Sequence, residues 1–297
     1  MRQRGSRSST RLHNIESLAP WLRDTAARLE AVSDTARLDA ELIAAHALGI
    51  ERQEMLLKLR DLHVPDAAER LVARRLRHEP VAHIVGTRDF WTLTLNVTAD
   101  TLIPRPDSET LIEAAVAHFA GTAGPKRVID LGTGSGALLL AALDQWPEAT
   151  GIGIDISPRA LSVAHGNAAR LGMGDRTRFR QGDWGMAVED RFDLLLCNPP
   201  YISTRERLSP EVADHEPYGA LFAGTDGLDC YRLLAPQTAR LLVPGGLALF
   251  EIGHDQGDSV PPLFADAGFA PVVLPDLGGR ARCVKLIAGH DGELHAS

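Results

Sequence analysis

Hydrophobic residues in the first third of the chain recur at the spacing of amphipathic helices. Leu18, Leu22 and Leu29 are separated by charged residues, and a second series of the same kind runs from Leu38 to Ala47. No cluster of chemically active side chains accompanies either series. The pattern predicts a small helical bundle over residues 14–80, with packing and substrate recognition as its roles.

The pattern changes to short alternating runs between residues 81 and 106. Apolar and polar residues alternate from Phe90 to Val97, Gly86 precedes this run, and the proline-rich sequence Leu-Ile-Pro-Arg-Pro follows it. Alternation with turn residues at both ends is typical of β-strands. We therefore expect a β-hairpin linker over residues 81–106, between two domains.

From residue 107 to residue 289, apolar runs alternate with helical segments. Strands are expected at residues 127–131, 150–155, 177–181, 192–197 and 246–251, with a final antiparallel pair at 270–274 and 283–287. Repeated strand–helix units require a mostly parallel, doubly wound sheet. The predicted fold class is α/β: a seven-stranded Rossmann-like sheet with an antiparallel last strand, preceded by the small helical bundle.

Composition and charge narrow the possible partners. Hydrophobic residues make up 44% of the 297 positions and charged residues 24%, as in ordinary globular proteins. A formal net charge of −8 disfavours broad binding to nucleic-acid backbones, and no apolar run reaches the roughly 20 residues of a membrane helix. Cys197, Cys230 and Cys283 lie far apart and lack metal-ligand spacing. We expect a cytoplasmic, monomeric protein without a metal or a membrane partner.

The two ends of the chain differ from the rest. Residues 1–13 contain four arginines and several serines but no acid, a composition shared by organellar transit peptides and disordered tails. No uninterrupted apolar segment follows, which favours a flexible basic tail. A second flexible tail is expected over residues 290–297.

A glycine-rich loop connects the first strand of the sheet to the helix that follows it. Gly132, Thr133, Gly134, Ser135 and Gly136 form this loop. Glycines there permit a tight turn and let a ligand approach the backbone near a helix N-terminus. The spacing differs from the GxGxxG of dinucleotide sites, and the lysine of a P-loop is missing.

Acidic and aromatic residues end the next two strands. Asp155 comes about 20 residues after the loop, where a carboxylate can bind ribose hydroxyls. Asp183 and Trp184 offer an acceptor and an apolar face for adenine. Each feature alone also fits a structural role: a bare turn, a helix cap at Asp155, or core packing by Trp184. Their position at the ends of successive strands, without a phosphate-binding lysine, predicts S-adenosylmethionine over NAD or ATP.

The sequence Asn198, Pro199, Pro200 and Tyr201 follows the apolar strand at residues 192–197. Two prolines fix the backbone and remove two N–H donors, so rigid carbonyl acceptors lie next to an amide side chain and an aromatic ring. Such an arrangement suits a planar nitrogen that donates hydrogen bonds, as in an amide or a base amine. The same residues also fit a proline-rich turn with Tyr201 in the core.

With this motif added, the sequence resembles class I S-adenosylmethionine-dependent methyltransferases, and more narrowly the HemK-type release-factor glutamine methyltransferase family. The resemblance is carried by Ile-Pro-Arg-Pro-Asp-Ser-Glu at residues 103–109, the glycine loop, Asp183 with Trp184, Asn198 to Ile202, and the segments at 250–257 and 276–280. It implies a methyltransferase domain over residues 107–289. A sister family that methylates a ribosomal protein has Ile-Pro-Arg-Ser at the first motif, a departure that favours release factors here.

The resemblance also implies roles for individual residues. The glycine loop, Asp155 and Trp184 would hold S-adenosylmethionine, with Asn198 beside its methionine part. The segment from Asn198 to Tyr201 would hold the glutamine of a Gly-Gly-Gln motif. Asn198 Oδ1 and the Pro199 carbonyl would accept its N–H groups while Tyr201 packs on the amide plane, and no base is assigned.

Three alternative functions stay open from the sequence. The first is a glutamine methyltransferase that acts on a ribosomal protein. The second is a DNA adenine methyltransferase, which needs a basic recognition region, whereas the stretch from Glu206 to Glu216 is acidic. The third is a binding module without catalysis, which the intact glycine loop, Asp155 and Asn198 disfavour. We expect no direct nucleic-acid substrate.

Overall fold

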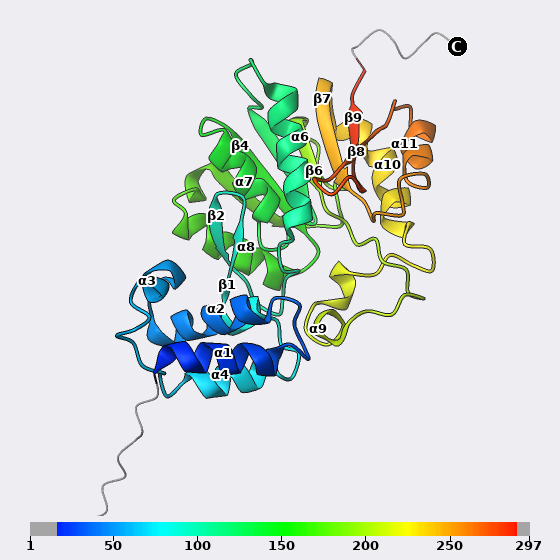
Figure 1. The fold of residues 1–297 in the computed structure, drawn as a ribbon. Coiled ribbons are helices and arrows are strands. Elements are labelled where there is room, and N and C mark those ends of the chain that lie inside the picture. The colour runs from blue at the N-terminus through cyan, green and yellow to red at the C-terminus, as the bar shows by residue number, and fades with distance from the viewer. Residues whose placement is uncertain (1–16, 290–297) are drawn as a thin grey trace, which may run out of the picture. The chain divides into compact units, whose positions relative to one another are not determined.

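The computed structural model describes residues 17–289, and the chain divides after Val85 into two compact units (Figure 1). The tails predicted at residues 1–13 and 290–297 lie outside the described residues. The predicted domain boundaries stay a prediction.

The first unit is helical, as its apolar periodicity predicts. Its described helices are α1 (Leu18–Leu29), α2 (Ala36–Leu48), α3 (Arg52–Leu57), α4 (Ala68–Arg75) and α5 (Val81–Val85). The last of these occupies the beginning of the segment predicted as a hairpin linker.

Packing within this unit follows the sequence pattern in α1 but only in part in α2. Leu18, Leu22 and Leu29 are fully buried, whereas Leu38 is 39% exposed. The neighbouring Asp39 is buried instead, because its Oδ2 atom lies 2.7 Å from Nε of Arg75 in α4. A buried carboxylate needs such a partner. In α2, Asp39 therefore lies in the interior of the bundle beside Ile43, whereas Leu38 lies on its surface.

The second unit begins with the predicted β-hairpin. Strands β1 (Thr87–Phe90) and β2 (Leu93–Asn96) pair antiparallel. The alternating run does not continue as one strand, because the chain turns at Trp91 with a φ of 55°. The Trp91 N–H donates to Oε1 of Glu109 at 2.8 Å, so a distant acid supports a turn that has no glycine.

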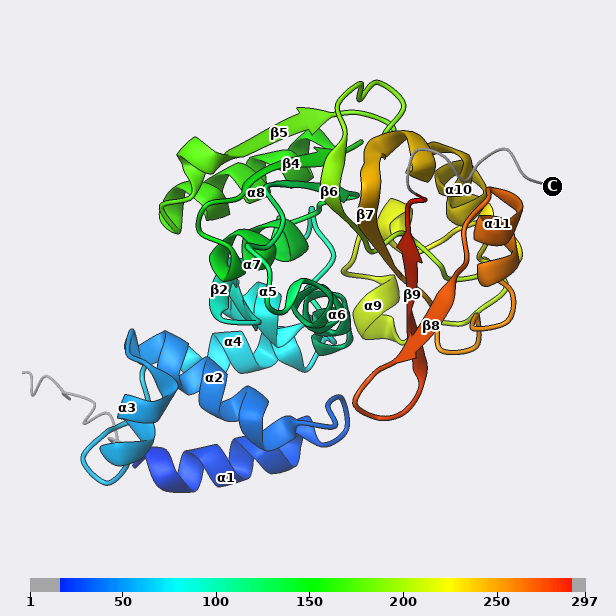
Figure 2. The same cartoon turned by 90° about the horizontal axis from the view of Figure 1, so that it is seen from above.

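Seven strands form the sheet of the second unit: β3 (Arg127–Leu131), β4 (Thr150–Asp155), β5 (Thr177–Gln181), β6 (Phe192–Cys197), β7 (Leu242–Glu251), β8 (Val272–Pro275) and β9 (Ala281–Ile287). Their order is β5-β4-β3-β6-β7-β9-β8, with β5 and β8 at the two edges in Figure 2. The pairs among the first five are parallel, and β9 runs antiparallel to both of its neighbours. The predicted fold class is confirmed.

Helices cover both faces of this sheet. The α-helices are α6 (Glu109–Phe119), α7 (Ala137–Gln145), α8 (Pro158–Arg170), α9 (Pro210–Ala213), α10 (Asp229–Leu241) and α11 (Pro261–Asp266), and short 3₁₀ helices are η1 (Pro106–Ser108), η2 (Gly174–Arg176) and η3 (Tyr218–Ala220). Alternate residues of β6 enter two cores: Leu194 and Leu196 pack with α6 and α7, and Leu195 and Cys197 pack with α10. A strand buried on both faces reads as a continuous apolar run, which is why β6 was predictable. None of the helices within residues 17–289 is long and apolar enough to cross a membrane.

The topology brings the ends of β3 and β6 together. Leu131 and Cys197, the last residues of these two strands, are partners in the parallel register. The chain leaves β3 toward β4 on one side, whereas β6 lies on the other side. Open α/β sheets bind ligands at such a switch point, beyond the carboxyl ends of the strands.

Candidate active site

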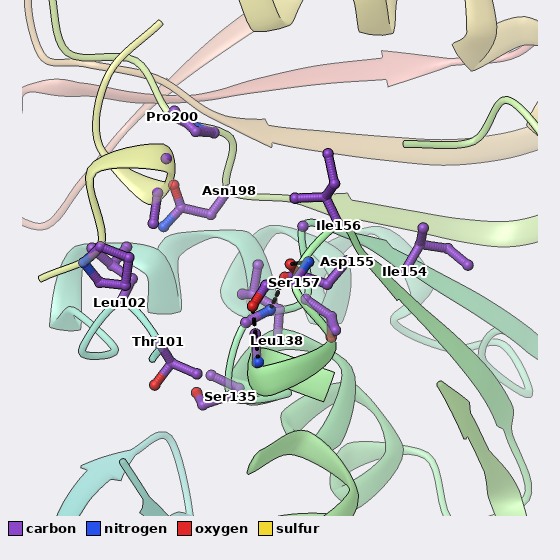
Figure 3. A pocket seen from close by; sticks show the side chains of 18 of the residues that line it. Thr101, Leu102, Ser135, Leu138, Ile154, Asp155, Ile156, Ser157, Asn198 and Pro200 are labelled. Carbon is purple, nitrogen blue, oxygen red and sulfur yellow. Dashed lines mark hydrogen bonds between the residues drawn. The ribbon is translucent and has the colours of Figure 1, made fainter. Parts of the chain in front are cut away.

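A pocket of about 420 Å³ opens at this switch point (Figure 3). Predicted site residues that line it are Gly132, Thr133, Gly134, Ser135, Asp155, Asp183, Trp184, Asn198 and Pro200. Three others, Gly136, Pro199 and Tyr201, are not part of its lining. The structure therefore brings the glycine loop, the two acidic strand ends and the amide of Asn198 to one cavity.

The buried acid Asp130 supports the glycine loop through a hydrogen bond to one of its residues. Gly132, Gly134 and Gly136 have φ values of 74°, 55° and 85°, a region that favours glycine. Under the loop, Oδ2 of Asp130 accepts a hydrogen bond from the Thr133 hydroxyl at 2.6 Å. Burial raises the pKa of Asp130 from 3.8 to about 7. Asp130 was not among the predicted site residues, although its place near the carboxyl end of a buried strand was a usable signal.

The glycine loop and the Trp184 ring form a concave surface, called the cradle below. A side chain at Gly132 would fill it. A Cβ atom at Gly132 would lie 3.2 Å from the Trp184 ring, closer than most side-chain contacts. Trp184 itself has a φ of 50°, and it is partly buried against the core on that side of the sheet. The predicted apolar face is thus held against the loop at the pocket wall.

Asp155 has two structural bonds and retains the capacity for more. Its Oδ2 atom accepts the Gly134 N–H at 2.9 Å and its Oδ1 atom accepts the Ser157 N–H at 2.9 Å, as the dashed lines in Figure 3 show. Each carboxylate oxygen can accept a second hydrogen bond. The cap role and the ligand role of Asp155 are therefore compatible. Together, the glycine loop, the Asp155 carboxylate and the Trp184 ring fit a nucleoside such as that of S-adenosylmethionine.

Asn198 is held by a contact that the sequence did not suggest. Its Nδ2 atom donates to Oγ of Ser108 at 3.1 Å, and its Oδ1 atom has no protein hydrogen-bond partner within residues 17–289. Ser108 ends η1 and is 4% exposed. The amide of Asn198 is consequently anchored at one end and left with a free acceptor at the other.

Tyr201 is directed away from the pocket and toward β7. Its hydroxyl donates to Oε1 of Glu251 at 3.3 Å, and its ring packs against a buried cluster of the core. Burial raises the pKa of Tyr201 well above its ordinary value. Glu251 is 0% exposed, and burial raises its pKa from 4.5 to about 7. In this structure, Tyr201 braces the motif on the sheet.

The Ile-Pro-Arg-Pro-Asp-Ser-Glu segment connects several parts of the second unit. The carboxylate of Glu216 pairs with Arg105 and accepts the Ile103 N–H at 3.2 Å. Asp107 lies 2.9 Å from Nη2 of Arg282 in β9. Ser108, Glu216 and Glu251 were not among the predicted site residues, although Glu251 ends the apolar strand β7.

Comparisons with known proteins agree with this geometry. Residues 20–86 match the PrmC N-terminal domain, and residues 124–250 match a methyltransferase domain. A release factor glutamine methyltransferase of Cereibacter sphaeroides is 47% identical over 273 residues, covering 90% of this chain and 96% of that protein. One of Rhodospirillum rubrum is 46% identical over 254 residues, covering 84% and 78%. The chain belongs to the release factor glutamine methyltransferase family.

A solved structure supports the fold of this family member. The crystal structure of a methyltransferase from Pyrococcus furiosus has a TM-score of 0.51 and 16% sequence identity, covering 75% of this chain and 99% of that one. The predicted enzyme class, an S-adenosylmethionine-dependent methyltransferase, is confirmed by family membership. The roles assigned to single residues remain predictions.

Proposed function

We propose that this enzyme transfers a methyl group from S-adenosylmethionine to the side-chain amide nitrogen of glutamine in the Gly-Gly-Gln motif of peptide-chain release factors. The observation that carries the proposal is the shared pocket of Asn198, Asp155 and the glycine loop. One half of the pocket suits a nucleoside, and the other presents an acceptor for a donor amide. The names of the relatives support the choice of protein substrate.

The residues that would hold S-adenosylmethionine are those around the cradle. Gly132, Thr133, Gly134 and Ser135 would contact it through the loop backbone, with Gly136 supporting the turn, while Asp155 would accept from ribose hydroxyls. Asp183 and Trp184 would receive the adenine, and Asn198 would lie beside the methionine part. When bound, the group would supply a methyl carbon on a positively charged sulfur, from which a correctly placed nucleophile would displace the neutral thioether.

The protein's main task at the other half of the pocket is orientation. An amide nitrogen is a poor nucleophile because its lone pair is delocalised into the carbonyl. Asn198 Oδ1 and the Pro199 carbonyl would accept its two N–H groups, while Pro200 lines the pocket, which directs the remaining lone pair and stabilises positive charge on nitrogen. Tyr201 would keep these acceptors in place through Glu251, and the proton would leave to water.

The expected setting follows from the proposed substrate. We place the enzyme in the cytoplasm, acting as a monomer on release factors, with the helical first unit in substrate recognition. The presence of Cys197, Cys230 and Cys283 as free thiols supports a reducing compartment. The net charge of −8 supports a protein partner over a nucleic acid.

The test is a methyl-transfer assay with labelled S-adenosylmethionine. Purified enzyme would be offered a release factor, the same factor with the Gly-Gly-Gln glutamine replaced by alanine, a large-subunit ribosomal protein, and duplex DNA. We expect label on the unaltered release factor alone, and mass spectrometry should find one methyl group on that glutamine. Label on the ribosomal protein or the DNA, with none on the release factor, would reverse the proposal.

A further inference from the structure

Ser108 lies between two groups of the site. Its Oγ atom accepts from Asn198 Nδ2 at 3.1 Å. Its hydroxyl also interacts with the Glu251 carboxyl group and lowers the pKa of that acid, although the two groups do not meet in the close geometry of a formed hydrogen bond. Both neighbours come from the ends of adjacent strands, because Asn198 follows β6 and Glu251 ends β7. Ser108 is therefore the link between a pocket residue and a fully buried acid.

The Glu251 carboxyl group has an unfilled acceptor. Its Oε1 atom accepts from Tyr201 at 3.3 Å, but its Oε2 atom is buried and has no close hydrogen-bond partner among residues 17–289. A buried carboxylate oxygen without a donor is costly, so it strongly attracts a neighbouring hydroxyl hydrogen. Ser108 carries such a hydrogen.

We propose that Ser108 and Glu251 are positioning residues that fix which end of the Asn198 amide faces the substrate. This inference rests on the proposed function. A serine hydroxyl has one hydrogen. When that hydrogen is held by the Glu251 carboxylate, Oγ can only accept, so it binds the Asn198 NH₂ group. Asn198 Oδ1 is then the end that remains for the substrate amide, whose N–H groups need an acceptor.

The reversed amide would be unproductive. With Asn198 turned by 180°, its NH₂ group would meet the N–H groups of the substrate, and two donors cannot form a hydrogen bond. Without the charged acid behind Ser108, its hydroxyl hydrogen is free to bind Asn198 Oδ1 and to favour that reversed form. The charge of Glu251 thereby controls the orientation of a group that it does not touch.

Protonation of Glu251 gives this inference a pH signature. Burial raises the pKa of Glu251 to about 7, and the Ser108 hydroxyl and Arg282 oppose that rise. The other titratable groups that interact with Glu251 are Asp107, Tyr201, Tyr231, Cys197 and Cys283. A neutral Glu251 can itself donate to Ser108, which releases the serine hydrogen. The turnover number should therefore fall as the pH decreases through about 7.

The first test compares substitutions of the serine. Ser108→Ala should lower kcat by about 10- to 100-fold, the scale on which loss of a residue that orients a site ligand acts, while the Kd for S-adenosylmethionine changes little. Ser108→Thr keeps the hydroxyl and should recover most of the activity. Thr238→Val is the control, since Thr238 is a buried hydroxyl of α10 that binds only the Leu234 carbonyl in its own helix. It should retain the kcat of the unaltered enzyme.

The second test measures the pH profile. The unaltered enzyme should lose kcat below about pH 7, whereas Glu251→Gln should be slow at every pH and lack this acid limb. An unaltered kcat in Ser108→Ala, or an acid limb that persists in a folded Glu251→Gln enzyme, would overturn the inference. If Glu251→Gln does not fold, the serine series alone decides. Failure of the unaltered enzyme to methylate any release factor would instead refute the proposed function.

Discussion

The Nδ2 atom of Asn198 lies 3.1 Å from the Oγ atom of Ser108, although 90 residues separate them in the chain. This bond joins the Asn-Pro-Pro-Tyr motif to the Ile103–Glu109 segment. The two motifs are far apart in the sequence but form one structure at the pocket. A change in either motif should therefore affect the orientation of the same amide group.

Removal of the Asn198 side chain should separate catalysis from cofactor binding. In Asn198→Ala, we expect kcat to fall by about 10²- to 10³-fold, because an acceptor for the substrate amide is lost. The glycine loop and Asp155 are unchanged, so S-adenosylmethionine should still bind in isothermal titration calorimetry. Methyl transfer at the normal rate by this variant would refute the assigned role of Asn198.

The cradle at Gly132 should be required for cofactor binding. Gly132→Ala places a Cβ atom 3.2 Å from the Trp184 ring, at a φ of 74° that costs an alanine roughly 1–2 kcal/mol. We expect the Kd for S-adenosylmethionine to rise at least about tenfold, which is 1.4 kcal/mol. Gly121→Ala is the matched control, because Gly121 has a φ of 77° but no neighbouring atom within 4 Å. Equal Kd values in the two variants would exclude a specific cradle.

The parts of the fold that could be predicted are those determined by residues close together in the sequence. Strands β3, β4, β5 and β6 have the bounds that the sequence predicts. Of these, β3 and β6 are mostly apolar runs that are buried within the sheet, whereas β5 is an edge strand that alternates between polar and apolar residues. The strand-to-helix turn at Gly132 was likewise predictable. In this loop, three residues with positive φ require glycine, and glycine is visible in any sequence.

The parts that could not be predicted depend on pairs of distant residues. Nothing near Ser108 indicates that it contacts Asn198, and nothing near Leu38 indicates that Arg75 draws the neighbouring Asp39 inward. Likewise, the sequence around Tyr201 suggests a pocket residue, but its hydroxyl binds the buried Glu251 instead. Local patterns give the end of each strand, whereas the folded chain determines which side chains meet there.

The ion pair between Arg105 and Glu216 should hold one wall of the pocket. Glu216 precedes Pro217, Gly219 and Ala220, which line that wall. In Glu216→Ala, the buried Ile103 N–H loses its acceptor, at a cost of about 1–3 kcal/mol. We expect a lower thermal midpoint and a higher KM for the release factor.

A double-mutant cycle with Arg105→Ala and Glu216→Ala tests that this wall depends on the pair. Residues in direct contact should show a coupling energy in both stability and KM. Glu216→Gln is the conservative control, since it keeps an acceptor for the Ile103 N–H and should be milder than Glu216→Ala. Strictly additive effects of the two alanine substitutions would contradict a functional ion pair.

Asp130 should make the enzyme less stable as the pH rises. Burial raises its pKa from 3.8 to about 7, so the folded state binds a proton that the unfolded state has already released at pH 5.5. Its contribution to stability is complete below about pH 4 and is lost as the pH passes 7. Between pH 5.5 and 8, linkage of this one group should remove about 2 kcal/mol from the free energy of unfolding.

Urea unfolding of the unaltered enzyme and of Asp130→Asn, at pH 5.5 and pH 8, measures this contribution. The variant should show a smaller loss of stability between the two pH values, because asparagine does not titrate. It should keep the part of the loss that comes from Glu251, whose pKa burial also raises to about 7. The double variant with Glu251→Gln should lose this decline and keep the opposite trend from His118, whose pKa is lowered by burial. If Asp130→Asn shows the full pH dependence of the unaltered enzyme, the acid under the glycine loop is already charged at pH 5.5. In that case, the Thr133 hydroxyl and the other donors around Asp130 outweigh the cost of its burial.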